Sequence, residues 1–273
     1  MESQSVVRSS DPAYISISDV EKTYAADENP IPALKGINLD VAAGEFVSIV
    51  GPSGCGKSTL LKCVAGLQSV SSGSISIRQQ QVTAPPDNMA IVFQRDVLFD
   101  WRTVLDNVLI LVEFRGLRHP DYEARALKLL KDYGLDGYAH RFPWELSGGM
   151  RQRVAICRAL IVDPDLLLMD EPFGALDAMT RDNMNVELAR IAAEAGKTVF
   201  LITHSIAESV FLSDRVLVMS SRPGRIIETI PIDLPRPRSL DVVADPIFAA
   251  TVLRIRRLLE HSTAANPHVT LAH

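Results

Sequence analysis

The hydrophobic residues of the chain fall into short runs that are typical of strands. Ile15 and Ile17 alternate with Ser16 and Ser18, a period of two that predicts a half-buried strand. Compact apolar runs indicate strands that are buried on both faces of a sheet. Strand patterns of these two kinds occupy residues 31–39, 46–50, 89–93, 166–169, 198–203 and 215–220.

Helical signals lie between these strands, marked by apolar positions at helical spacing, by capping residues and by glycines that end a helix. Alternating strands and helices predict an α/β fold with a mostly parallel sheet covered on both faces. The marking residues are 58–65 closed by Gly66, 121–133 followed by Gly134, the face Met184, Leu188, Ile191 and Ala195 before Gly196, and the capping-box pair Ser205 and Glu208.

The chain is expected to divide into four parts. The polar residues 1–12 predict a disordered leader. Residues 13–95 and 161–225 carry the strand–helix alternation of the core, and residues 96–160 between them predict a mainly helical insert. Residues 226–273 predict a linker and a terminal helix.

The predicted terminal helix begins at Asp245-Pro246, after a linker punctuated by prolines. We expect it to pack on its own domain, because its apolar residues form a single stripe. The linker prolines are Pro231, Pro235 and Pro237, and the stripe is Phe248, Val252, Ile255 and Leu259.

Composition narrows the class of protein. The 273 residues are 47% hydrophobic with a formal net charge of -5 and no block of basic residues, which argues against a nucleic-acid ligand. The three cysteines, Cys55, Cys63 and Cys157, have neither metal-ligand spacing nor a paired framework, so reduced thiols are expected. No apolar run approaches the roughly 20 residues of a spanning helix, and the first residues lack a signal-peptide pattern.

One turn has the pattern of a phosphate-binding loop. It lies directly between the strand at 46–50 and the helix at 58–65, as G-x-x-x-x-G-K-[ST] requires. Glycines let the backbone approach phosphate closely, and the N–H groups at the helix start face the anion. We expect Lys57 to reach the β- and γ-phosphates and the Ser58 hydroxyl to ligate Mg²⁺. The loop consists of Gly51, Pro52, Ser53, Gly54, Cys55, Gly56, Lys57 and Ser58. Cys55 is expected to contribute its N–H, with a reactive thiol as the alternative.

A pair of carboxylates follows the buried strand at 166–169. Parallel strands deliver such residues to the edge of the sheet where α/β proteins bind ligands. Asp170 is predicted to hold the Mg²⁺ shell, and Glu171 to polarise the attacking water as a general base. Together with the loop, these residues predict a P-loop ATPase.

A third segment, Leu146-Ser-Gly-Gly-Met-Arg-Gln-Arg153, resembles the LSGGQ signature of the ABC ATPase family. That resemblance implies a P-loop NTPase fold with a RecA-like, mainly parallel sheet, an antiparallel β subdomain and a helical subdomain insert. It also implies that Ser147, Gly148 and Gly149 contact the γ-phosphate bound by a second subunit, so that two ATP molecules lie between two chains. Two positions depart from the commonest pattern, Met150 for Gln and Gly174 for Ser, and neither removes a phosphate contact.

The resemblance assigns the remaining site residues, which occur in the family's order. Tyr24 corresponds to the aromatic residue that stacks on adenine, and Thr59 extends the ATP-binding loop. Gln94 corresponds to the glutamine that senses Mg²⁺ and the lytic water, Asp177 to the aspartate that crosses the dimer interface, and His204 to the histidine that holds the γ-phosphate.

Further segments are similar to the ATPases of nitrate, sulfonate and taurine importers, among them the sequence around Trp101, Arg102 and Thr103. In that group this region contacts the transmembrane permease subunits, while a separate protein binds the solute. The resemblance therefore implies a peripheral protein on the cytoplasmic face of the inner membrane. Alternatively, Trp101 packs inside the helical subdomain.

Other P-loop classes fit the sequence less well. Soluble ABC-type ATPases of DNA or ribosomes usually carry coiled coils or a second ATPase domain, and neither pattern is present. A kinase or GTPase is disfavoured by the signature segment and by the lack of an Asn-Lys-x-Asp motif. A non-hydrolysing regulator is expected to lack Glu171 or His204.

Overall fold

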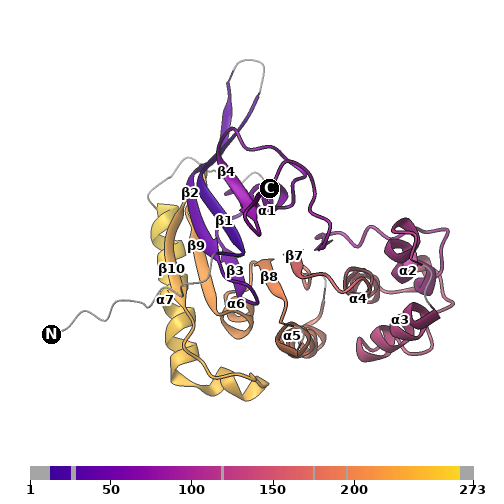
Figure 1. Cartoon of the computed structure of the whole chain (residues 1–273). Coiled ribbons are helices and arrows are strands. Elements are labelled where there is room, and N and C mark those ends of the chain that lie inside the picture. Colours follow the sequence, from indigo (N-terminus) through magenta and orange to yellow (C-terminus); the bar gives the residue numbers. More distant parts are fainter. Residues whose placement is uncertain (1–12, 26–28, 118–119, 175, 195, 265–273) are drawn as a thin grey trace.

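A computed structural model describes residues 13–25, 29–117, 120–174, 176–194 and 196–264 (Figure 1). The predicted leader, residues 1–12, and Ala195, which the sequence predicts on a helix face, lie outside the described residues. None of the helices in these ranges has the length and apolar content that crossing a bilayer requires.

The strands form two sheets, one antiparallel and one mainly parallel. The first has the order β2-β1-β4-β5 and the second the order β10-β9-β3-β8-β7-β6. Their bounds are β1 Ile15–Tyr24, β2 Ile31–Val41, β3 Phe46–Val50, β4 Ser72–Ile77, β5 Gln80–Gln81, β6 Met89–Val92, β7 Leu166–Asp170, β8 Thr198–Ile202, β9 Arg215–Met219 and β10 Ile226–Pro231.

Some helices lie against the parallel sheet, and others, among them α2 and α3, extend from one side of it, as Figure 1 shows. Helix α1 contacts β7 and β8, whereas α6 contacts β3 and β9. Their bounds are α1 Lys57–Val64, α2 Val104–Phe114, α3 Pro120–Asp132, α4 Gly148–Leu160, α5 Ala178–Glu194, α6 Ile206–Leu212 and α7 Pro246–Ala264.

Each central strand is apolar on both sides because the sheet has a hydrophobic core on each face. In β7, Leu167 and Met169 belong to one core, and Leu166 and Leu168 belong to the other. The same alternation runs through β3, β8 and β9. Successive side chains of a strand point to opposite faces, so both sets are removed from water. This confirms the predicted α/β architecture.

The helical region beside β6 is built from α2, α3 and α4, which contact one another. Helix α2 begins with a capping box in which the Thr103 hydroxyl accepts from the Asp106 N–H, while the Asp106 carboxylate accepts from the Thr103 N–H. Helix α4 also contacts β6, so it connects this region to the parallel sheet. The boundaries drawn from the sequence at residues 96 and 160 remain a prediction.

The parallel sheet extends beyond residue 225, where the sequence placed only a linker. Strand β10 pairs antiparallel with β9, with Thr229 opposite Leu217 and Ile230 opposite Val216. The sequence does not reveal this strand, because Pro231 at its end is equally typical of a linker. A proline is tolerated at this position, since β10 lies at the edge of the sheet.

The segment after β10 is fastened to the end of α6 by a buried arginine. Arg238 donates to the carbonyl oxygens of Val210, Phe211 and Ser213 at 2.8–3.1 Å. The end of a helix leaves such carbonyls without intrahelical partners, and a cation suits the negative end of the dipole. Burial lowers the pKa of the Arg238 guanidinium to about 10, so it remains charged at neutral pH.

Helix α7 packs against α6 and β9, as expected for a helix with a single apolar stripe. Phe248 and Ile255 of that stripe are buried in the core on the α6 side of the sheet. Val252 and Leu259 are partly buried against the same core.

We predict that Arg238→Met lowers the free energy of unfolding by about 3 kcal/mol, because several charge-assisted hydrogen bonds are lost while buried carbonyls stay unpaired. Urea denaturation followed by circular dichroism measures the change. As a control, Arg256→Met alters an exposed arginine of α7 and is expected to stay within about 0.5 kcal/mol of the wild type. Equal effects of the two substitutions would contradict the role of Arg238.

Candidate active site

The predicted phosphate-binding, metal-binding and catalytic residues lie at the carboxyl ends of four neighbouring strands. The P-loop follows β3, Asp170 ends β7, Gln94 follows β6 and His204 follows β8. Because β3, β8, β7 and β6 are consecutive and parallel, their carboxyl ends lie along the same edge of the sheet.

The P-loop wraps around its lysine. The Lys57 ammonium donates to the Gly51 carbonyl at 2.8 Å and to the Pro52 carbonyl at 3.0 Å, and the side chain is buried. Gly56 immediately precedes α1 with a φ of 111°, where a side chain would come within 2.7 Å of the Ala33 carbonyl. Glycine is therefore required at this position for the loop to reach the start of the helix.

The Cys55 side chain is buried inside the loop, 3.9 Å from the Lys57 ammonium. Burial raises the pKa of its thiol, and the charge of Lys57 offsets only part of this effect. A protonated, buried thiol fits the structural role expected of Cys55 rather than that of a reactive group.

Two oxygen ligands suited to Mg²⁺ meet beside the loop. The Ser58 hydroxyl donates to Asp170 Oδ1 at 3.1 Å. Within the described part of the chain, no group of three or more His, Cys, Asp or Glu side chains could hold a metal ion. A hydroxyl and one carboxylate agree with Mg²⁺, which is usually bound through one or two carboxylates together with substrate phosphates.

Glu171 is held by two other site residues. Its Oε1 lies 2.6 Å from His204 Nε2, and its Oε2 accepts from Gln94 Nε2 at 3.0 Å. Its backbone has a φ of 51°, a left-handed conformation that costs a non-glycine residue about 1–3 kcal/mol. The Glu171 N–H still donates to the Ile202 carbonyl of β8, so its backbone remains bonded to the sheet edge.

A cavity of about 620 Å³ opens beside Glu171. Most of the residues that line it are polar or charged, and among those that the sequence did not assign to the site are Arg181 and Glu208. The other residues around it are Gln94, Arg95, Glu171, Phe173, Gly174, Thr203, His204 and Ser205.

The signature segment is exposed at the start of α4. The Ser147 hydroxyl caps the helix by accepting from the Met150 N–H at 3.3 Å, and Ser147 and Gly148 face solvent. Asp177 is also exposed and caps α5, where the Thr180 N–H donates to it and lowers the pKa of its carboxyl. None of these residues lines the cavity beside Glu171.

Tyr24 lies at the end of β1 beside the P-loop helix. Its hydroxyl donates to Gln68 Oε1 at 2.7 Å and lies 3.2 Å from the Thr59 hydroxyl. The residue is partly buried, and its predicted contact with adenine remains a prediction.

Comparisons with known proteins agree with this geometry. Residues 34–174 match the family described as ABC transporter. The taurine import ATP-binding protein TauB of Rhizobium johnstonii is 46% identical over 238 residues, which cover 85% of this chain and 90% of that protein. TauB of Escherichia coli K12 is 44% identical over 230 residues, covering 82% and 90%.

A solved structure of a post-hydrolysis state of the dimeric ATP-binding cassette MJ0796, bound to ADP and Pi, is also similar. It has a TM-score of 0.74 and 34% identity, and the match covers 81% of this chain and 100% of that one. This chain belongs to the ABC transporter ATPase family. The predictions of a P-loop ATPase and of its fold are therefore confirmed.

In this ABC ATPase, side chains of α4 form hydrogen bonds with the segment that carries Gln94. The buried Gln152 donates to the Phe93 carbonyl at 3.2 Å, and Arg158 donates to the carbonyls of Asp96 and Val97 at 2.7–2.8 Å. The sequence identified α4 through the signature alone and gave no sign of these contacts, because they join residues about 60 positions apart.

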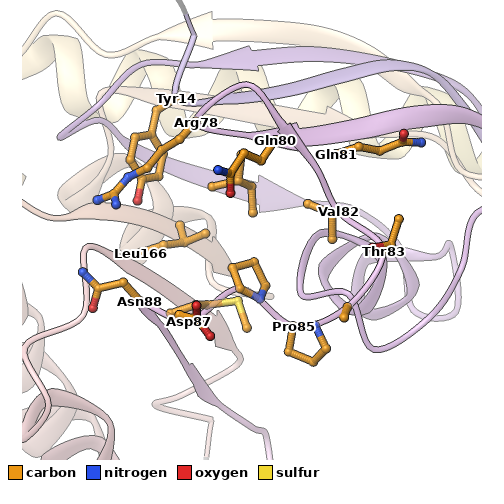
Figure 2. Close-up of a pocket in the computed structure, with 14 residues that line it drawn as sticks. Tyr14, Arg78, Gln80, Gln81, Val82, Thr83, Pro85, Asp87, Asn88 and Leu166 are labelled. Carbon is orange, nitrogen blue, oxygen red and sulfur yellow. The ribbon is translucent and has the colours of Figure 1, made fainter.

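The ABC ATPase has another cavity, of about 390 Å³, shown in Figure 2. It lies at the amino ends of β6 and β7, where Asn88 and Leu166 contribute to its wall. Arg78 points to the Tyr14 ring there and pairs with Asp165. Since ligands of α/β sheets bind at the carboxyl ends, this cavity is separate from the candidate active site.

Gly224 is a further residue that the motifs do not reveal. A side chain there would come within 2.2 Å of the Cys55 carbonyl in the P-loop. Its N–H donates to the Ala33 carbonyl and its carbonyl accepts from the Lys35 N–H, so it cannot move away.

We predict that Gly224→Ala displaces the P-loop and weakens ATP binding. Overpacking of this kind costs about 1–3 kcal/mol, so the dissociation constant should rise roughly tenfold. Titration with a fluorescent ATP analogue measures it, and Ser221→Ala in the same turn serves as a control with unchanged affinity. An unchanged affinity of Gly224→Ala would show that the loop tolerates the added methyl group.

Proposed function

We propose that this ABC ATPase supplies the energy for an importer of taurine, another sulfonate, nitrate or a similar small solute. The observation that carries the enzymatic part is the meeting of Ser58, Asp170, Glu171, Gln94 and His204 at one sheet edge. The importer and its class of solute are supported by the relatives named for taurine import. The solute would be recognised by other components, because no described feature of the site suits it rather than ATP.

Within one chain, the P-loop backbone and Lys57 would bind the phosphates, and Tyr24 would contact the adenine. Ser58, Asp170 and Gln94 would hold Mg²⁺, with Asp170 acting through water. When bound, Mg²⁺ would neutralise charge on the phosphate oxygens. The contacts of Lys57 with the Gly51 and Pro52 carbonyls support this role, since its ammonium would exchange these partners for phosphate oxygens of higher charge.

Glu171 would act as the general base that takes a proton from the attacking water. Its position supports this role, because it directly follows Asp170 and is held on both sides by Gln94 and His204. His204 would also bind the γ-phosphate, so its 2.6 Å contact with Glu171 connects the base to the group that is transferred to water.

Two copies of the chain would close over two ATP molecules. Ser147, Gly148 and Gly149 at the start of α4, and Asp177, would complete the site of the partner subunit. The exposure of Ser147, Gly148 and Asp177 supports this assignment, since the N–H groups at the start of a helix suit an anion. The dimeric form of the related cassette gives the same support. ATP would stabilise the closed pair by binding it more tightly than the open form.

The region around Trp101 would contact the transmembrane permease. Trp101 is 74% exposed and contacts the Phe99 ring at 5.1 Å, so the alternative of a buried tryptophan is wrong. Exposed aromatic residues are enriched at protein interfaces. Docked in this way, the chain would lie peripherally on the cytoplasmic face of the inner membrane, and a separate solute-binding protein would act through the permease.

We predict that Glu171→Gln retains ATP binding and loses turnover by about 10²–10⁴-fold, the usual contribution of a general base. Because ATP is no longer consumed, the closed pair should accumulate. Phosphate release and gel filtration with ATP measure the two effects. A variant that turns over normally, or that stays monomeric with saturating ATP, would contradict the assignment.

For Trp101→Ala we expect normal ATP hydrolysis by the isolated chain and a loss of transport of at least roughly tenfold, since interface aromatic residues contribute about 2 kcal/mol or more. Uptake of labelled taurine and nitrate into vesicles containing the permease and binding protein measures transport. The exposed Trp144 provides a matched control, Trp144→Ala, with unimpaired docking. A parallel loss of isolated ATPase activity would indicate a folding role of Trp101 instead.

A further inference from the structure

The turn that carries His204 is held by a closed ring of hydrogen bonds. The Thr203 hydroxyl donates to the Glu208 carboxylate and accepts from the Ser205 N–H at 3.0 Å. The Ser205 hydroxyl in turn accepts from the Glu208 N–H at 3.2 Å. The residues on both sides of His204 are therefore joined to each other and to the first turn of α6.

This ring differs from the capping box that the sequence predicted. In a capping box, the carboxylate at the third helical position accepts directly from the N–H of the capping residue. Here Ser205 caps α6 as expected, but its N–H is bonded to Thr203, and the Glu208 carboxylate is bonded to the Thr203 hydroxyl. Glu208 consequently acts on the residue before His204 as well as on the helix.

Thr203 and Glu208 of the ring are buried and Ser205 is partly buried, whereas the histidine that the ring carries is exposed. Thr203 is 3% exposed and Glu208 5%, but the His204 side chain is 52% exposed. An exposed side chain has little packing to fix it, so the position of the His204 ring depends on its backbone and on its single contact with Glu171. The Thr203 N–H also donates to the Ile49 carbonyl of β3, which anchors the ring to the sheet.

Helix capping alone does not explain a buried acid at residue 208. Glutamine serves equally at the third position of a capping box, and burying a carboxylate is costly. Burial raises the pKa of Glu208 to about 7, while Arg181 of α5 lowers it and Glu171 beyond β7 raises it. Its Oε1 has no hydrogen-bond partner among the described residues, and the side chain lines the cavity shared with Glu171 and His204.

We propose that Glu208 is a positioning residue for ATP hydrolysis, which acts through the Thr203 hydroxyl to hold the turn that presents His204 to Glu171 and the γ-phosphate. The proposal rests on the function proposed above for His204. It requires an acceptor at residue 208 and a hydroxyl at residue 203, and no direct contact of either residue with ATP.

The test compares Glu208→Ala and Thr203→Val with Glu208→Gln, which resembles the neutral form of the acid and keeps an acceptor oxygen. We expect the first two variants to lower kcat by about 10- to 100-fold, the effect of a small misplacement, with the KM for ATP within about twofold of the wild type. Glu208→Gln should restore most of kcat. Thr203→Val retains the shape of the buried side chain and is expected to fold. If Glu208→Ala does not fold, the kcat of Thr203→Val alone tests the proposal.

Nuclear magnetic resonance of the His204 ring supplies a readout that general destabilisation would not change. We expect its signal, assigned with His204→Ala, to shift in Glu208→Ala and Thr203→Val and to return in Glu208→Gln. The control Val210→Ala truncates a buried residue of the same helix. It should lower the melting temperature while leaving kcat and the His204 signal unchanged.

Two outcomes separate failure of this inference from failure of the proposed function. If His204→Ala is inactive while Glu208→Ala and Thr203→Val retain full kcat, the positioning role is overturned and the role of His204 stands. If His204→Ala itself turns over normally, the proposed function of His204 fails first. A rise in KM alone, or a shifted His204 signal in Val210→Ala, also overturns the positioning role.

Discussion

Parallel pairing of β3, β8, β7 and β6 is the constraint on which the candidate active site depends. It brings the ends of four strands, of which Val50 and Ile202 are the farthest apart in the sequence, to one edge. The contacts of Glu171 with Gln94 and His204 join the ends of neighbouring strands at that edge, and the hydrogen bond from Ser58 to Asp170 passes across the end of β8, which lies between β3 and β7. A slip of one residue in any pairing would move a strand's apolar side chains to the wrong face and its terminal polar residue out of reach.

Much of this arrangement could be predicted from the sequence because each strand carries its own signal. The apolar runs at β3, β7 and β8 identify strands buried on both faces, and the loop before Lys57 has a spacing that phosphate binding explains. Gln94, Asp177 and His204 could be predicted only from the family resemblance. A single polar residue after a strand or in a loop is too common to identify a site by itself. Strand β10 escaped prediction because its one proline is compatible with an edge strand as well as with a linker.

The contacts that fix the site were less predictable, since they depend on distant residues with no shared pattern. Nothing in the sequence indicates that Gln152 and Arg158 hold the carbonyls around Asp96, or that Gly224 lies against Cys55. The sequence predicts Glu208 as half of a capping box. The spacing of Ser205 and Glu208 does not reveal that the Thr203 hydroxyl bonds to both residues. The left-handed backbone of Glu171 could not be predicted from the sequence either, since a glutamate side chain does not favour that conformation.

The buried Arg238 has a consequence for the order in which the protein can be completed. Helix α6 begins beside His204, yet the charge that satisfies its final carbonyls comes from a residue beyond β10. During synthesis from the amino end, that helix must therefore wait for its last bonds until the arginine has left the ribosome. Until then the last turn of α6 keeps unpaired carbonyls, so the full stability of this helix should be reached only late in the growth of the chain.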